Sequence, residues 1–270
     1  MAWALILLSL VTSAEAQSPR LKNVDLCNGR DRTTPDAQTK GCTALIESGK
    51  ETPQVLALAY NNRGNAYTGK GQYDRAIQDY EQAIKLNPNY ASAFNNRGVA
   101  YQKKGEHDRA IKDFDEAIKL NPNYANAFAN RARTYQYKGE HDRAARDYDD
   151  VIRLNPGLAT AWNGRCWSRA ILGELQAALA DCNEALRLDP NAAATFDSRG
   201  LAYLKLSEWD SAIDDYSSAL RLDPKLASAL YGRGFAKLKN GDVMGANTDI
   251  AAAKELDANV LEDFVRYGVQ

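Results

Sequence analysis

One dipeptide recurs along this chain at a constant distance. Asn-Pro or Asp-Pro stands at five places, each 34 residues after the last: Asn87-Pro88, Asn121-Pro122, Asn155-Pro156, Asp189-Pro190 and Asp223-Pro224. The next place holds Asp257-Ala258, which keeps the acidic residue and loses the proline. A fixed period of this length is typical of stacked helix pairs, in which each repeat packs only on its neighbours. We therefore expect an all-α solenoid.

Placing the proline at position 32 divides most of the chain into six repeats. They cover 204 of the 270 residues, as 57–90, 91–124, 125–158, 159–192, 193–226 and 227–260. Positions 8 and 20 are small, as in Gly64 and Ala76, whereas position 24 is usually large, as in Tyr80. Small residues let two helices approach closely, and the large residue fills the space beside them. Glycine at position 15 and proline at position 32 end the two helices of each repeat.

This pattern resembles the tetratricopeptide repeat (TPR) family, in its bacterial exported form. The resemblance rests on the period, the small residues and the terminal proline, and it spans about three quarters of the chain. It implies a right-handed superhelix of about six helix-turn-helix repeats with helical caps. It also implies that the first helix of each repeat lines a concave groove.

Two positions carry opposite charges in every repeat. Position 7 is arginine: Arg63, Arg97, Arg131, Arg165, Arg199 and Arg233. Position 23 is aspartate: Asp79, Asp113, Asp147, Asp181, Asp215 and Asp249. Their strict co-occurrence predicts Arg–Asp pairs between the two helices, with two hydrogen bonds available to each pair. A row of ligand-binding arginines is the alternative, but presence in all six repeats favours the structural role.

The two ends of the chain differ from the repeats. Residues 1–16 hold an apolar run from Trp3 to Val11, followed by Ala14 and Ala16 in the A-x-A pattern of a signal-peptidase site. We expect a signal peptide that is cleaved, although no Lys or Arg precedes the run and a frayed apolar terminus is the alternative. The mature protein is then exported to the periplasm and has no membrane span. For residues 17–56 we expect an extension with a cap helix over 36–48, and for 261–270 a helix that caps the stack.

The four cysteines form two local pairs. Cys166 and Cys182 occupy positions 8 and 24 of the fourth repeat, which face each other across the helix pair, so their joint presence predicts a disulfide. Cys27 and Cys42 lie close together in the N-terminal extension and are expected to form a second. Disulfides persist outside the cytosol, in agreement with export. Buried free thiols and a redox protein are the alternatives, although neither pair has the Cys-x-x-Cys spacing of thiol exchange.

No motif in the sequence indicates catalysis. The two histidines, His107 and His141, share position 17 of their repeats, where packing is the expected role. A phosphate-binding glycine loop, a nucleophile elbow and a metalloprotease motif are all missing from the sequence. A net charge of −1 offers no broad attraction for nucleic acid. We expect no enzyme activity, no cofactor, no metal and no nucleic-acid partner.

The TPR resemblance also implies which side chains face the groove. They fall at positions 2, 5, 9, 12 and 13 of the first helices and include Asn61, Asn65, Asn95, Asn126, Arg133, Tyr137, Asn163, Trp167, Leu201, Tyr231 and Phe235. This set changes from Asn-rich to apolar along the chain. Asparagine can bond a peptide backbone and an aromatic stretch can receive apolar anchors. Packing between adjacent first helices is the alternative role of Trp167, Leu201 and Phe235.

These observations predict a non-catalytic scaffold of the bacterial cell envelope, which binds a peptide or protein segment in its groove. The alternative is an envelope assembly factor or carrier that holds an apolar ligand at the Trp167–Phe235 end. The sequence does not identify the partner or the oligomeric state.

Overall fold

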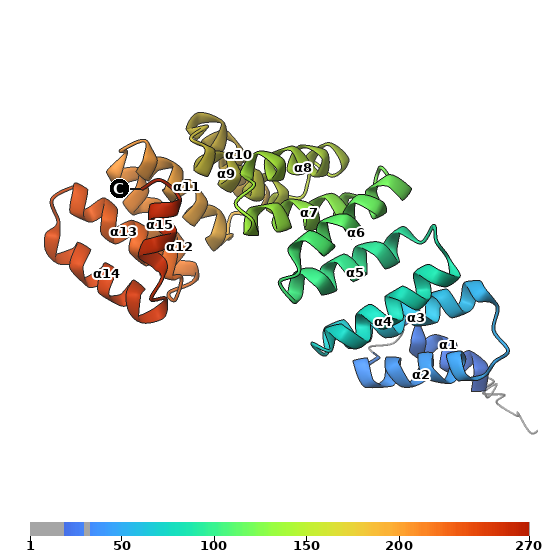
Figure 1. Cartoon of the computed structure of the whole chain (residues 1–270). Coiled ribbons are helices and arrows are strands. Elements are labelled where there is room, and N and C mark those ends of the chain that lie inside the picture. The colour runs from blue at the N-terminus through green and yellow to red at the C-terminus, as the bar shows by residue number, and fades with distance from the viewer. Residues whose placement is uncertain (1–18, 30–32, 270) are drawn as a thin grey trace, which may run out of the picture. The chain divides into compact units, whose positions relative to one another are not determined.

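The computed structural model describes residues 19–29 and 33–269 (Figure 1). These residues form fifteen α-helices, and no strand occurs among them. The predicted signal peptide, residues 1–16, lies outside the described residues. Among the described helices, none is both long enough and apolar enough to cross a membrane. The prediction of an all-α fold is confirmed.

The helices follow the 34-residue period. The first helices are α3 (Pro53–Gly69), α5 (Ala91–Lys103), α7 (Ala125–Tyr137), α9 (Ala159–Leu172), α11 (Ala193–Lys205) and α13 (Ala227–Lys239). The second helices are α4 (Tyr73–Leu86), α6 (His107–Leu120), α8 (His141–Leu154), α10 (Leu175–Leu188), α12 (Trp209–Leu222) and α14 (Val243–Leu256). From α5 onward every first helix begins 34 residues after the previous one.

Position 15 turns the chain between the two helices of a repeat. Glycine holds this position in five repeats with φ between 71° and 92°, a left-handed conformation that costs glycine little. The fifth repeat has Ser207 there instead, and its φ is 63°. Ser207 is the one described residue other than glycine with a positive φ. The turn therefore keeps its shape without its preferred residue.

Close contact between paired helices depends on the small residues. A Cβ atom on Gly64 would lie 2.6 Å from the ring of Tyr80, and one on Gly200 would lie 2.9 Å from the ring of Tyr216. Ala76, at position 20, is completely buried, as are its counterparts in the other repeats. The glycine-to-tyrosine approach thus explains why positions 8 and 24 differ in size.

The chain divides into two compact units between Lys104 and Gly105, within the second repeat. In the first unit, α1 (Pro19–Cys27) and α2 (Pro35–Glu47) precede α3, and α2 packs against both α1 and α3. A helix was expected over 36–48, where α2 lies, whereas α1 was not predicted. Cys27 and Cys42 form a disulfide that joins α1 to α2, with their Cα atoms 4.5 Å apart.

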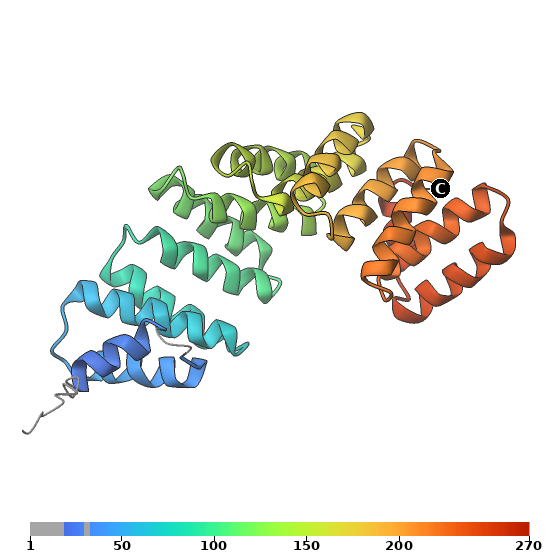
Figure 2. The ribbon, with the colours of Figure 1, turned by 180° about the vertical axis from the view of Figure 1, so that it is seen from behind.

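The second unit contains α6 to α14 and a short last helix, α15 (Val260–Arg266). Its helix pairs follow one another in chain order, as the two opposite views of Figures 1 and 2 show. Cys166 of α9 and Cys182 of α10 form a disulfide with a Cα–Cα distance of 5.4 Å, and both residues are fully buried. Helix α15 packs against α13 and α14.

Within the units, five Arg–Asp pairs join first and second helices. In each pair the arginine Nε and Nη2 atoms donate to the two oxygens of one buried aspartate, at 2.6–2.8 Å. Asp181 accepts a further hydrogen bond from Arg169, at 2.7 Å. Four of these arginines also lie beside aromatic rings of their own helices: Arg63, Arg131, Arg165 and Arg199. The sixth predicted pair, Arg97 and Asp113, belongs to different units and stays a prediction. We call this series the Arg–Asp ladder.

Candidate functional site

In both units the first helices of neighbouring repeats pack side by side, α3 with α5 in the first unit and α7, α9, α11 and α13 in sequence in the second. We call the surface that they form in each unit its first-helix face. The side chains predicted to line the groove are carried by these helices. The two faces have different chemistry and are described in turn.

Asparagines on the first-helix face of the first unit bond to one another. Asn96 Nδ2 donates to Asn61 Oδ1 at 3.1 Å and to Asn65 Oδ1 at 3.0 Å. Asn95 Nδ2 donates to Asn96 Oδ1 at 3.1 Å, and the Tyr80 hydroxyl donates to Asn65 Oδ1 at 2.8 Å. Asn61 and Asn95 are buried, whereas Asn65 is exposed. Much of the hydrogen-bonding capacity that was expected to serve a peptide is therefore used within the unit.

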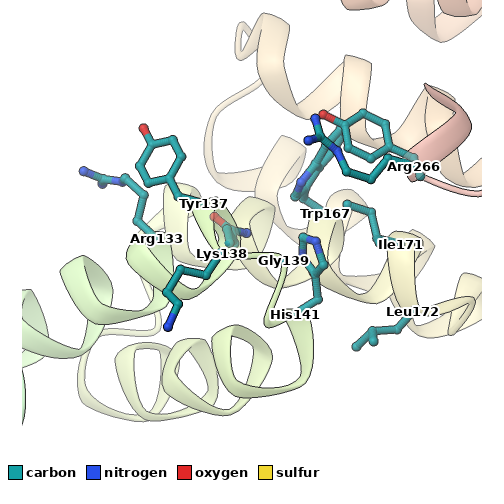
Figure 3. Close-up of a pocket in the computed structure, with 11 residues that line it drawn as sticks. Arg133, Tyr137, Lys138, Gly139, His141, Trp167, Ile171, Leu172 and Arg266 are labelled. Carbon is teal, nitrogen blue, oxygen red and sulfur yellow. The ribbon is translucent and has the colours of Figure 1, made fainter. Parts of the chain in front are cut away.

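The first-helix face of the second unit holds a hollow of about 750 Å³ between α7 and α9. Arg133 and Tyr137 of α7 lie on one side, and Trp167 of α9 lies on the other with Arg266 of α15 (Figure 3). Tyr137 is 66% exposed, although it is a large aromatic residue. The hollow therefore presents cationic and aromatic groups to the same space. Its other lining residues are Gln136, Lys138, Gly139, His141, Ile171, Leu172 and Tyr267.

A smaller hollow of about 340 Å³ shares Arg133, Gln136 and Trp167 with the first. Asn163 and Asp197 also line it. Asp197 is buried, and its Oδ2 atom accepts a hydrogen bond from Ser228 Oγ at 2.9 Å. Its Oδ1 atom and Asn163 Oδ1 have no hydrogen-bond partner among the described residues. Burial raises the pKa of the Asp197 carboxyl to about 7.

The last helix also lies on this face, and Figure 1 shows it in dark red beside α13. The Phe264 ring lies 4.7 Å from that of Tyr231 on α13, centroid to centroid. The Tyr267 ring meets Trp167 on α9 edge to face, at 4.9 Å. Lys205 of α11 donates to the Tyr267 carbonyl at 3.0 Å. The cap expected at the end of the stack thus has contacts that reach back to the fourth repeat.

The predicted groove residues of the second unit have different surroundings. Arg133, Tyr137, Asn163 and Trp167 line the two hollows, as described above. Asn126 is exposed on α7 and borders neither hollow. The other three contribute to packing: Leu201 and Tyr231 are buried, and Phe235 is half-buried beneath the Lys239 ammonium.

Asp197 and Lys205, two charged residues of α11 on this face, were not predicted from the sequence. Asp197 holds position 5 of the fifth repeat, the same position as Asn61, Asn95 and Asn163. Lys205 holds position 13, the same position as Tyr137. Both residues could have been predicted from the repeat alignment, because positions 5 and 13 were already assigned to the groove.

Neither histidine lies in a metal site. His141 borders the larger hollow, and burial lowers the pKa of its imidazole. His107 stacks on Tyr137 with the ring centroids 5.7 Å apart. Within the described part of the chain, no group of three or more His, Cys, Asp or Glu side chains could hold a metal ion.

Sequence comparison identifies the family. Residues 64–105 and 200–241 match the TPR repeat, and residues 91–124 and 130–193 match the tetratricopeptide repeat in two further forms. These segments together make up more than half of the chain. The protein belongs to the tetratricopeptide repeat family. No curated protein matches the sequence significantly.

Several solved structures have the same fold. A tetratricopeptide repeat protein from Parabacteroides merdae is 18% identical with a TM-score of 0.69, and the match covers 92% of this chain and 98% of that one. PilW, a widely conserved type IV pilus biogenesis factor, is 17% identical with a TM-score of 0.68, covering 78% of this chain and 98% of PilW. YrrB, a TPR protein with an unusual peptide-binding site, is 18% identical with a TM-score of 0.54, and the match covers 69% of this chain and 98% of YrrB. At these identities the likeness shows the fold alone.

Proposed function

We propose that this protein is a non-catalytic scaffold that binds a peptide or protein segment on the first-helix face of its second unit. The observation that carries the proposal is the pair of adjoining hollows that share Arg133 and Trp167. An exposed arginine and large aromatic side chains are the residue types that contribute most to binding at protein interfaces. Asn163 supplies an unpartnered acceptor beside them.

A peptide segment suits this face better than an apolar small molecule. The apolar ligand considered as an alternative would occupy the Trp167–Phe235 end. Phe264 and Tyr267 pack on this end from the chain's own last helix. The face thus already accommodates a segment of polypeptide, through its aromatic side chains and one main-chain carbonyl.

We place this binding in the bacterial periplasm. Two observations support this location: all four cysteines are paired in disulfides, and the N-terminal sequence has the pattern of a signal peptide. PilW, which shares the fold, is a pilus biogenesis factor, and YrrB has a peptide-binding site. Intact mass of the protein from a cell-envelope fraction tests the location. A chain that begins at Gln17 with no alkylatable thiol supports it, and an uncleaved chain with four free thiols contradicts it.

Partner capture with three single variants tests the binding site. Tagged Arg133→Ala, Trp167→Ala and Asn65→Ala proteins are cross-linked in the periplasm, purified and compared with the parent by quantitative mass spectrometry. We expect the first two to lose most of their specific partner and Asn65→Ala, the matched control in the first unit, to retain it. Capture that depends on Asn65 and not on Trp167 would contradict the proposal.

A further inference from the structure

The segment from Val260 to Val269 lies on the proposed binding face, although it belongs to the same chain. We propose that it is an intramolecular occupant of this face, and that the partner is a segment with two aromatic side chains three residues apart, which displaces it. This inference rests on the proposed function, because it names the kind of partner that the same face accepts. Phe264 and Tyr267 have this spacing in the chain itself.

The two aromatic residues provide the specific contacts of the segment. Phe264 is buried and packs against Tyr231, and Tyr267 packs edge to face on Trp167. The rings of Phe264 and Tyr267 lie 5.9 Å apart, since residues three apart project from the same side of a helix. Edge-to-face aromatic pairs of this kind are favourable beyond the area that they bury. A partner with the same spacing can therefore make both contacts at once.

Lys205 contacts the main chain of the segment, so this contact does not depend on which side chains the segment carries. Its Nζ atom donates to the carbonyls of Ala170 and Ile171, in the last turn of α9, at 2.8 and 3.0 Å. Its third hydrogen bond goes to the Tyr267 carbonyl. A cation at a helix C-terminus is held by the helix dipole, so Lys205 is positioned before any segment arrives. It can offer the same hydrogen bond to a backbone carbonyl of another peptide.

The segment is held by few side chains. Helix α15 has seven residues, and its Leu261, Glu262, Val265 and Arg266 are exposed. Its buried residues are Val260 and Phe264, and Val269 is buried beyond its end. Gly268 follows the helix with φ 80°, a conformation that ends it. The three buried residues join the core of the second unit through one short element at the end of the chain. Such an element can detach locally while the repeats beneath it stay folded.

The larger hollow adjoins the occupied site. Arg266 and Tyr267 form part of its lining together with Trp167. A partner that enters beside Arg133 and extends along the face would therefore meet Tyr267 on the surface that it needs. Release of the segment would expose Trp167 and Tyr231 and lengthen the binding surface across three repeats.

Fluorescence anisotropy with a labelled synthetic peptide of residues 258–269 tests this inference. The full chain and its Phe264→Ala/Tyr267→Ala variant are titrated with this peptide and with a control peptide in which both aromatics are alanine. We expect the variant to bind the labelled peptide about tenfold more tightly than the parent, since its own segment no longer competes. The control peptide should bind neither protein. Equal binding of the first peptide by parent and variant, or binding of the control peptide as strong as that of the first, would overturn the inference.

Two further measurements keep the test decisive. Tyr267→Ala alone removes a side chain that is only partly buried, so this variant should fold even where the double variant does not, and it should also bind the peptide more tightly than the parent. Light scattering of the parent should give the mass of one chain, because the segment is held within it. A dimer that dissociates in the double variant would show that the segment binds a second copy, which contradicts intramolecular occupancy.

The outcomes separate this inference from the proposed function. If Trp167→Ala abolishes partner capture but the peptide binds parent and variant equally, the scaffold function stands and the aromatic segment is not its ligand. If Trp167→Ala and Arg133→Ala both leave capture unchanged, the proposed function fails regardless of the peptide result.

Discussion

The two units share one repeat and differ in the chemistry of their first-helix faces. In the first unit, Asn96 of α5 donates hydrogen bonds to Asn61 and Asn65 of α3. In the second unit, Trp167 and an exposed arginine border open hollows, and Asp197 has an unpartnered oxygen. The Arg–Asp ladder and the small residues of the helix contacts are common to both. Positions 5, 9 and 13 can therefore change their chemistry while the fold stays the same.

The largest loss of stability is expected when one pair of the Arg–Asp ladder is broken. Asp181 in the second unit accepts hydrogen bonds from Arg165 and Arg169, whereas Asp79 in the first unit pairs with Arg63 alone. Removing one partner of a buried ion pair leaves an uncompensated charge and costs about 3–5 kcal/mol. We expect Asp181→Ala to approach the upper value and Asp79→Ala to lie near or below the lower one. Urea denaturation followed by circular dichroism measures both, and equal losses would show that the second arginine adds nothing.

Asp197, on the first-helix face of the second unit, is expected to make the free energy of unfolding depend on pH. Its folded-state pKa of about 7 lies above the ordinary 3.8, so the folded chain binds this proton more tightly than the unfolded chain. The free energy of unfolding therefore falls as pH rises from about 4 to about 7, by up to about 4 kcal/mol from this group. Asp197→Asn should remove the fall, since an amide keeps an acceptor for Ser228 and carries no charge.

Denaturation midpoints from pH 4 to pH 8 check this prediction. The matched control is Asp214→Asn, which makes the same change of side chain at an exposed position of the same unit. A parent-like slope in Asp197→Asn would mean that this carboxyl is already ionised at pH 5. Asn95 and Asn163 occupy the same repeat position as Asp197. Because their amides carry no charge, they add no pH dependence to the free energy of unfolding.

A smaller loss is expected when the asparagine network is broken. Asn96→Ala removes the donor to Asn61 and Asn65 and the acceptor for Asn95. We expect a loss of about 1–2 kcal/mol in unfolding free energy, since buried amide groups lose their partners. Partner capture should stay at the parental level, because this network lies outside the proposed binding face. Capture that falls together with stability would assign the first unit a part in binding.

The smallest effect is expected at the turn of the fifth repeat. Ser207 adopts the left-handed conformation that glycine holds at position 15 of the other repeats. Ser207→Gly should stabilise the chain by about 0.5–1 kcal/mol, because glycine adopts this conformation without steric cost. Gly173→Ser, at the same position of the fourth repeat, should destabilise by a similar amount. Thermal denaturation of the pair measures both, and a Ser207→Gly protein that melts below the parent would contradict the argument.

Sequence repetition explains which features could be predicted. The helix starts, the turn glycines and the Arg–Asp pairs of the ladder each recur in at least five of the six repeats, so a constraint that is weak in one copy becomes clear in the series. Cys166 and Cys182 were predicted to pair because both depart from the residue types usual at positions that face each other. Each of these features depends on contacts within one repeat.

The remaining features occur once and have no repeated pattern. The contact between Tyr267 and Trp167 joins residues 100 positions apart, and no other repeat has a counterpart of it. Helix α1 lies before the first recognisable repeat. Asp197 and Lys205 lay on positions assigned to the groove, but their burial and hydrogen bonds depend on Ser228 and on the end of α9. Tertiary contacts of this kind leave no periodic signal in one sequence.

Site-specific photo-cross-linking tests most directly whether the second unit alone carries the binding face. A photoreactive phenylalanine replaces Tyr137 in one protein and Asn65 in another, since both side chains are exposed on first helices of different units. After irradiation in the periplasm, adducts are resolved and quantified by mass. We predict a specific adduct from position 137 and none from position 65. Adducts from position 65 at an equal or higher yield would contradict the assignment of binding to the second unit.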